Sequence, residues 1–363
     1  MKKLISMLLS MFVILNLAAC STSNNNAAST TAAPATTTTT TSTAAQAATT
    51  TTTTTSAPAS SGQKTVYVIV KVLGNQYWSV LQAGAEKAGK DLGCKVVIVG
   101  TAAESDIEGQ LRYLQDAVSA QAAGIVIAPL DSVSLSKPIE EAYKSGIPIV
   151  LVDTIVNGDS YSAALLTNNV NAGKMAAQEM IRQLKAKGVA EDKEGVIAIQ
   201  AGSSGSQTIN DRIKGFNEYW DANAPKNWKV LNNDIKINEG DISKAVGFGQ
   251  DFITTYTNLI GVFGPNNGST VGFVTALTEA NRTDICMIGF DFSAEIEKMI
   301  RSGKFNVSSV VQRQYNMGYD GVKDALNLAN GGTVAEKMVD TGVLLVNADN
   351  VDSPDVQGVI HPQ

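Results

Sequence analysis

From residue 64 onward, short apolar runs alternate with longer stretches in which apolar residues recur at helical spacing. The apolar runs are rich in Val and Ile, as buried strands are, and the stretches between them are long enough to form helices. In the first half the pattern predicts strands at 65–70, 95–99, 124–128 and 148–152, with helices that include 79–92 and 106–121. Strands that alternate with helices in this way form a mostly parallel sheet.

The second half of the chain repeats this alternation. Strands are expected at 196–200, 228–237, 260–263 and 286–290, and helices at 210–219, 243–255 and 269–280. Because about 300 residues exceed the usual size of one hydrophobic core, we expect two α/β lobes of similar architecture. The final segment, 306–363, is too short for a third domain and is expected to return and complete both lobes.

A different pattern precedes the alternating part. Lys2 and Lys3 are followed by an apolar run over 4–19 and then by Cys20, which is the order of a secretory signal. The run is about 15 residues long, short of the ~20 that span a bilayer as a helix. Residues 17–20, Leu-Ala-Ala-Cys, resemble the lipobox of bacterial lipoproteins. We therefore expect 1–19 to be removed as a signal peptide and Cys20 to carry the lipid anchor on the outer face of the cell membrane. An ordinary signal peptide with an incidental cysteine is the alternative.

Residues 20–63 consist almost entirely of Thr, Ser, Ala, Asn, Pro and Gln. Such a composition buries too little apolar surface to fold, so we expect a disordered tether. A flexible coil of about 40 residues reaches on the order of 35 Å, enough to lift a folded part off the lipid. The threonines are candidates for O-glycosylation, and an inert tail is the alternative.

Composition narrows the classes of function. The formal net charge of −6 and the sequence pI near 5.0 argue against a nucleic-acid partner, because phosphate binding needs a clustered basic face. His361 is the only histidine, so neither a His-based triad nor a multi-histidine zinc site can form. The sequence contains neither a phosphate-binding loop nor a dinucleotide fingerprint. We expect no cofactor, no metal and no enzyme activity, with Cys94 and Cys286 as buried hydrophobes; a disulfide between them is the alternative.

Ligands of open parallel sheets bind at the carboxyl ends of the strands. The loops expected there carry ionised and amide groups beside aromatic rings, at Asn75, Tyr77, Trp78, Asp153, Arg212, Asn266, Phe290, Asp291 and Gln312. Carboxylates accept hydrogen bonds from hydroxyl groups, guanidinium and amide groups donate to them, and aromatic rings cover the apolar faces of a sugar. The mixture predicts a polyhydroxylated ligand, although Tyr77 and Trp78 could be core residues and Arg212 an exposed helix residue.

At this point the chain resembles the type I periplasmic binding proteins of the ribose-binding kind, the solute receptors of ABC importers. Six segments carry the resemblance: 75–78, 146–148 with Asp153, 210–216, 263–268, 288–291 and 311–312. The resemblance implies two Rossmann-like lobes with parallel central sheets, joined by a three-segment hinge near Thr167, Arg313 and Asp340. The lobes would comprise 64–166 with 313–340, and 167–312 with 341–363.

Carried over by position, the resemblance implies that Asn75, Tyr77, Trp78 and Asp153 contact ligand from the first lobe, and that the second lobe or hinge contributes Arg212, Asn266, Phe290, Asp291 and Gln312. Three positions depart from the ribose binders: Lys71 replaces a small polar residue, Ala128 an asparagine and Thr154 an arginine. Ribose itself is therefore disfavoured, and Lys71 joins the expected site because a lysine there resembles a branch that includes autoinducer-2-binding lipoproteins.

The function expected from the resemblance is a monomeric receptor that captures a sugar or polyol between its lobes and presents it to an ABC permease. A sensory receptor for a sugar-like signal, acting through a membrane signalling partner, is one alternative. A glycosidase-like enzyme that uses Asp153 and Asp291 as a carboxylate pair is another.

Overall fold

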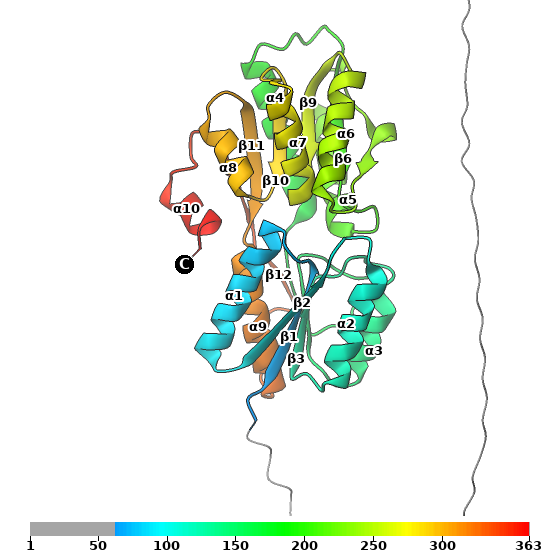
Figure 1. The fold of residues 1–363 in the computed structure, drawn as a ribbon, viewed down its shortest axis with the longest axis vertical. Coiled ribbons are helices and arrows are strands. Elements are labelled where there is room, and N and C mark those ends of the chain that lie inside the picture. Colours follow the sequence, from blue (N-terminus) through cyan, green and yellow to red (C-terminus); the bar gives the residue numbers. More distant parts are fainter. Residues whose placement is uncertain (1–61, 363) are drawn as a thin grey trace, which may run out of the picture. The chain divides into compact units, whose positions relative to one another are not determined.

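The computed structural model describes residues 62–362. The predicted signal peptide, Cys20 and the tether up to residue 61 lie outside the described residues. Within the described part the chain forms two α/β lobes, each built on one central sheet (Figure 1). In this part of the chain no helix is long and apolar enough to cross a bilayer.

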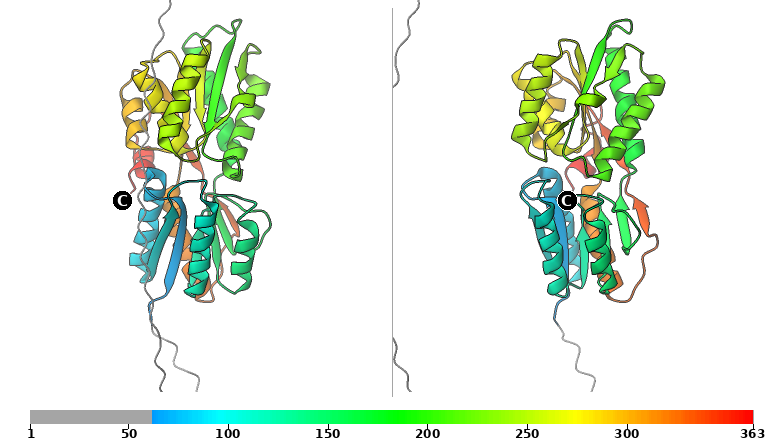
Figure 2. Two further views of the ribbon diagram at one scale, coloured as in Figure 1. Left: turned by 45° about the vertical axis from the view of Figure 1, so that its right-hand side comes forward. Right: turned by 90° about the vertical axis from the view of Figure 1, so that its right-hand side faces the viewer.

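The first lobe has a six-stranded sheet in the order β12-β5-β4-β3-β1-β2, with every pair parallel. Its strands are β1 (Thr65–Val72), β2 (Lys95–Thr101), β3 (Gly124–Ile127), β4 (Ile149–Val152), β5 (Ala163–Leu166) and β12 (Met338–Asp340). One face of the sheet packs against α1 (Gln76–Leu92) and α9 (Gln314–Ala329). The other face packs against α2 (Ile107–Ser119) and α3 (Ser136–Lys144) (Figure 2). Both faces are covered by helices, so the strands read as continuous apolar runs.

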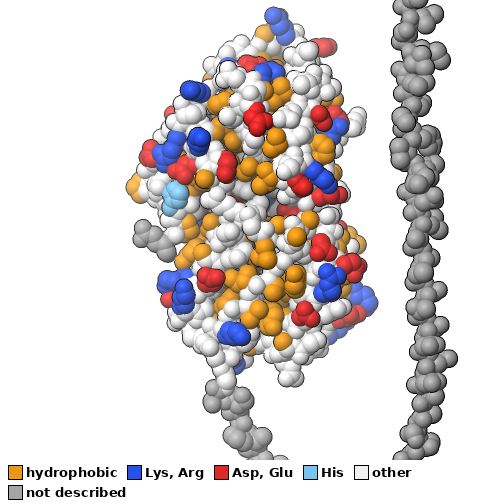
Figure 3. Space-filling model, in the orientation of Figure 1, with side chains coloured by type: hydrophobic (Ala, Val, Ile, Leu, Met, Phe, Trp, Pro, Cys, Tyr) orange, Lys and Arg blue, Asp and Glu red, His pale blue; other side chains and the backbone are white. Residues whose placement is uncertain are grey.

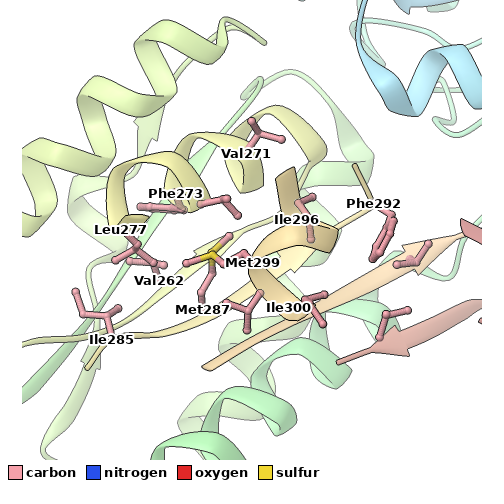
Figure 4. Packing of buried hydrophobic residues seen from close by; sticks show 14 of the residues in the cluster. Val262, Val271, Phe273, Leu277, Ile285, Met287, Phe292, Ile296, Met299 and Ile300 are labelled. Atoms are coloured by element: carbon pink, nitrogen blue, oxygen red, sulfur yellow. The ribbon is translucent and has the colours of Figure 1, made fainter. Parts of the chain in front are cut away.

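The second lobe has a similar sheet in the order β13-β11-β10-β9-β6-β7, in which every pair is parallel except the edge pair β13-β11, which is antiparallel. Its strands are β6 (Gly195–Ala201), β7 (Trp228–Val230), β9 (Leu259–Gly264), β10 (Cys286–Phe290), β11 (Asn306–Gln312) and β13 (Val343–Val346), and a short β8 (Lys236–Ile237) also pairs with β6. One face packs against α4 (Asn169–Ala186) and α5 (Gln207–Asn223). The other face packs against α6 (Ile242–Thr255), α7 (Asn267–Glu279), α8 (Ala294–Arg301) and α10 (Pro354–Ile360). Figure 4 shows part of the core on this second face, to which Phe273 of α7, Met287 of β10 and Ile296 of α8 belong.

The chain passes between the two sheets three times: between β5 and α4, between β11 and α9, and between β12 and β13. As a result the lobes exchange helices, because α4 follows a strand of the first lobe but packs on α5, and α9 follows a strand of the second lobe but packs on α1. The expected fold, two lobes with parallel sheets joined by a three-segment hinge, is confirmed.

Local details differ from the expected elements. The stretch 228–237 is two short strands separated by a 3-10 turn, η1 (Asn232–Asp234), rather than one strand. Strand β5 was not predicted, because its sequence Ala-Ala-Leu-Leu lacks the β-branched residues that mark strands. Cys94 and Cys286 are both buried and unpaired, which confirms them as small core residues.

Candidate functional site

A cavity lies between the lobes, at the carboxyl ends of their strands. It measures about 30 Å³, space for a few water molecules. Twelve residues line it: Lys71, Asn75, Tyr77, Trp78, Glu104, Asp153, Thr208, Ile209, Arg212, Asn266, Asn267 and Asp291. This is where parallel α/β sheets place their ligands.

Asp153 forms the centre of the first lobe's side of the cavity. Its carboxylate accepts hydrogen bonds from the hydroxyls of Tyr77, at 2.7 Å, and Thr154, at 2.6 Å, and lies 3.0 Å from the ammonium group of Lys71. Lys71 also donates to the hydroxyls of Thr154 and Ser206. Burial alone would raise the pKa of Asp153, but two neighbouring cations and two hydroxyl donors outweigh it and hold that pKa below its ordinary value. The first lobe therefore presents a buried carboxylate that lies beside the Lys71 ammonium group and accepts two hydrogen bonds from hydroxyls.

Helix α1 positions the aromatic wall of the cavity. It begins three residues earlier than the sequence pattern predicted, and Asn75 is its N-cap, with a side-chain oxygen that accepts from the backbone N–H of Tyr77 at 2.9 Å. The cap places Tyr77 and Trp78 in the first turn, where their rings meet edge to face with centroids 4.7 Å apart. Both rings are buried in the first core as well as lining the cavity. The core and ligand interpretations of these two residues are thus compatible.

Arg212 lies on the second lobe's side, on α5, and is buried rather than exposed. Its Nε donates to Asn169 and one terminal nitrogen donates to the carbonyl oxygen of Pro265, both at 2.8 Å. Its guanidinium carbon lies 4.2 Å from the centroid of the Phe290 ring. The other terminal nitrogen, Nη2, is buried and has no hydrogen-bond partner among the described residues. A buried guanidinium nitrogen without an acceptor is costly unless something else supplies one.

Asp291 directly follows β10 in the second lobe, as Asp153 directly follows β4 in the first. It accepts a hydrogen bond from the Gln312 amide at 2.8 Å, and the carbonyl of Gln312 accepts from the hydroxyl of Thr167 at 2.9 Å. Burial raises the pKa of Asp291 to about 6 despite the charge of Arg212. Gln312 thus connects a carboxylate of the cavity to the crossing between β5 and α4.

The lobes are closed on one another around the cavity. The Thr154 and Thr208 hydroxyls are 2.9 Å apart across the gap. The backbone N–H of Gln207 donates to the Ser132 hydroxyl at 3.2 Å. These contacts are hydrogen bonds between polar groups, which water can replace when the lobes separate.

The structure brings eight of the ten expected ligand residues to the cavity. The other two, Phe290 and Gln312, lie behind it, under Arg212 and beside Asp291 respectively. Four cavity residues were not expected: Glu104, Thr208, Ile209 and Asn267. Glu104 stands three residues beyond β2, so the rule about strand ends could have found it.

The chemistry of the cavity is that of hydrogen bonding beside aromatic rings. Across the described range 62–362, no group of three His, Cys, Asp or Glu side chains could hold a metal ion. On the face shown in Figure 3, basic and acidic side chains are interspersed over both lobes. The arrangement offers carboxylate acceptors, a guanidinium donor and amides around a small volume, which is the donor and acceptor set that hydroxyl groups match.

Comparison with known proteins agrees with the fold and the position of the cavity. Residues 66–333 match the family model described as a periplasmic binding protein domain. The D-allose-binding periplasmic protein of Escherichia coli is 27% identical over 283 residues, which cover 74% of this chain and 85% of that protein.

Two solved structures are also similar. One is a carbohydrate transporter solute-binding protein from Agrobacterium radiobacter in complex with D-arabinose, with 34% identity, a TM-score of 0.78, and coverage of 83% of this chain and 100% of that one. The other is an ABC transporter solute-binding protein from Agrobacterium vitis with bound D-fucose, with 30% identity, a TM-score of 0.75, and coverage of 82% and 100%. Two closed α/β lobes, a polar cavity at their strand ends and a family match over most of the folded part lead to one conclusion: the chain belongs to the periplasmic binding protein family.

Proposed function

We propose that this protein binds a sugar or sugar-like polyol between its lobes and delivers it to an ABC permease. The observation that carries the proposal is the buried Nη2 atom of Arg212, which lacks an acceptor among the residues in the described range although its side chain lines the cavity. A sugar hydroxyl supplies that acceptor and can in turn donate to a carboxylate such as Asp291.

The dimensions of the cavity indicate how the ligand enters. A space of about 30 Å³ does not admit a monosaccharide, so the lobes must separate before the ligand binds. The hinge consists of three short crossings, and the contacts across the cleft, such as Thr154 to Thr208, are polar and easily exchanged with water. A sugar that touches both lobes would then favour a liganded closed state through its additional contacts.

The relatives support a sugar as the ligand. The names of the three reported relatives specify D-allose, D-arabinose and D-fucose, which are neutral monosaccharides. The residues that we propose to contact the ligand are Lys71, Asn75, Tyr77, Trp78, Asp153, Arg212, Asn266 and Asp291, with Phe290 and Gln312 supporting them from behind.

The lipid anchor is proposed from the sequence alone. Acylation of Cys20 and a tether over 20–63 would keep a monomeric receptor near its permease outside the cytoplasmic membrane. Replacing Cys20 with Ser should release the protein into the medium or periplasm, and metabolic labelling with a palmitate analogue should mark only the parent protein. Labelling of the Ser variant would contradict the anchor.

The binding proposal is tested by thermal unfolding of the folded part, residues 62–363, with a panel of neutral aldopentoses and aldohexoses. A ligand that binds the native state at about 100 times its Kd stabilises it by about 2.7 kcal/mol, which raises Tm by several degrees. We expect at least one sugar to do so, and expect the same sugar to have no effect on Arg212→Ala. Equal Tm values with and without every sugar would contradict the proposal.

A further inference from the structure

Glu104 occupies a distinctive place in the cavity. It lies in the loop between β2 and α2 of the first lobe, and its side chain crosses to the second lobe. A Cβ atom built on Gly202 would lie 2.5 Å from its Oε2, and one built on Gly240 would lie 2.8 Å from its Cγ. The backbone N–H of Glu104 also donates to the carbonyl oxygen of Glu239 at 3.1 Å. Because Gly202 and Gly240 carry no side chain, they leave a slot in the second lobe, and the Glu104 side chain occupies this slot when the lobes are closed.

The Glu104 carboxylate has no hydrogen-bond donor within the described part of the chain. Lys71 is the cation that lowers the pKa of Glu104 most, but its ammonium group is already directed at Asp153 and two hydroxyls. Burial raises the pKa of Glu104 above its ordinary value. A partly buried carboxylate without a donor is costly, and a ligand hydroxyl would remove that cost.

The charges around the cavity have an uneven balance. Three carboxylates line it, on Glu104, Asp153 and Asp291, against two cations, on Lys71 and Arg212. Lys71 is satisfied by groups of the protein, whereas Arg212 has one free nitrogen. A ligand with its own carboxylate or phosphate would add negative charge beside Glu104 in a site of low dielectric constant.

We infer that Glu104 is a specificity-determining residue, which accepts a hydrogen bond from a hydroxyl of the bound sugar and excludes acidic sugars. The inference rests on the proposed function and deepens it, because it restricts the ligand to neutral sugars with a hydroxyl directed at the β2–α2 loop. The slot formed by Gly202 and Gly240 makes the contact available only in the closed state, so Glu104 also favours closure around the correct ligand.

Isothermal titration calorimetry on residues 62–363 tests the inference with the neutral sugar that binds most tightly and with its uronate. Glu104→Gln keeps the shape but removes the charge, and Glu104→Asp keeps the charge but withdraws it from the slot. We expect both to weaken binding of the neutral sugar about 10- to 100-fold, the range of a hydrogen bond to a charged group. Parent protein should prefer the neutral sugar at least about 100-fold over its uronate, and Glu104→Gln should reduce that preference.

Glu108→Gln is the matched control, because Glu108 is exposed in the first turn of α2, four residues beyond Glu104, and does not line the cavity. It should bind both ligands as the parent protein does. Unchanged affinity in both Glu104 variants, or a uronate that binds the parent protein as tightly as the neutral sugar, would overturn the inference while the proposed function stands. Failure of the parent protein to bind any sugar would overturn both.

Discussion

Asp153 and Asp291 occupy equivalent places in the two lobes, yet their electrostatic environments are opposite. Asp153 directly follows β4 and Asp291 directly follows β10, and these two strands hold the same position in the strand orders of their sheets. Each aspartate adopts a left-handed backbone conformation, with φ of 64° and 68° respectively. The pKa of Asp153 is held below its ordinary value, whereas that of Asp291 is raised to about 6. Non-glycine residues rarely adopt positive φ, and such strain is concentrated at functional sites.

The difference lies in the partners that surround each carboxylate. Asp153 is 3.0 Å from the ammonium group of Lys71, whereas the hydrogen bonds to Asp291 come from neutral groups, the amide of Gln312 and the backbone N–H of Asn267. A repeated fold can thus place the same residue at the same strand end and still give it a different charge state. The carboxylate of the first lobe is the more acidic of the two, and that of the second lobe titrates closer to neutral pH.

The largest expected effect comes from making Asp153 resemble Asp291. Lys71→Met removes the cation and leaves a buried carboxylate, which should cost about 3–5 kcal/mol of unfolding free energy at neutral pH and raise the pKa of Asp153. Urea unfolding measures the first quantity. The double variant Lys71→Met with Asp153→Asn should recover most of the lost stability. If Lys71→Met alone were within about 1 kcal/mol of the parent protein, the Lys71–Asp153 pair would not be the cause of the difference between the two aspartates.

Arg212 is the second way to test the comparison, because its charge lowers the pKa of both aspartates. Arg212→Ala should weaken sugar binding by about 100-fold or more, since it removes the free Nη2 donor together with the guanidinium group that lies over the Phe290 ring. Calorimetric titration measures the affinity, and circular dichroism checks that the variant is folded. Affinity within threefold of the parent protein would place the ligand elsewhere.

The helix exchange offers a test in which the lobes should behave alike. Gly84 on α1 packs against the backbone of α9, and Gly215 on α5 packs against the backbone of α4, so that a Cβ on either would overlap a carbonyl oxygen, of Tyr315 and Val170 respectively. Ala at either position should cost about 1–3 kcal/mol through overpacking.

Gly247→Ala on α6 is the control for this pair, because a Cβ there has no heavy atom within 4 Å. It should be neutral or stabilise by up to about 1 kcal/mol, since Ala favours helix more than Gly. Urea unfolding of the three variants decides: a cost for only one of Gly84→Ala and Gly215→Ala would mean that the two helix pairs are not equivalent.

The smallest expected effect is the pH dependence that separates the two aspartates. A folded-state pKa raised from 3.8 to about 6 means that Asp291 contributes stability below pH 3.8 and loses it as pH rises through 6. Between pH 5 and 7.5 the loss is about 1.4 kcal/mol, and Asp291→Asn should abolish it. Asp153→Asn should retain most of this slope, because burial, the largest cause of the raised pKa of Asp291, remains, and the lowered pKa of Asp153 places its own titration at more acidic pH. Equal slopes for the parent protein and Asp291→Asn would contradict the assignment.

The alternation of apolar runs was sufficient to predict most strands and their ends, and therefore Asp153 and Asp291, whereas Lys71 was expected from the resemblance to a known family. Glu104, three residues beyond β2, was within reach of the rule about strand ends, but Thr208 was not, because it lies in the first turn of α5 and reaches the cavity only through the closure of one lobe on the other. Nor does periodicity reveal that α4 and α9 are exchanged, since an amphipathic helix can pack on either sheet. The resemblance to a known family, rather than the pattern, predicted the three crossings. The roles of Phe290 and Gln312 behind the cavity depend on side-chain packing, which sequence spacing does not contain.

The central claim is that a neutral sugar lies between Asp153 and Asp291, with Arg212 as a donor. A crystal structure of residues 62–363, grown with the sugar that gives the largest rise in Tm, tests it most directly. We predict electron density for one sugar between the lobes, with a hydroxyl oxygen within about 3 Å of Arg212 Nη2 and another hydroxyl donating to Asp291. Sugar density outside this cavity, or an ordered sugar that leaves Nη2 without an acceptor, would contradict the account.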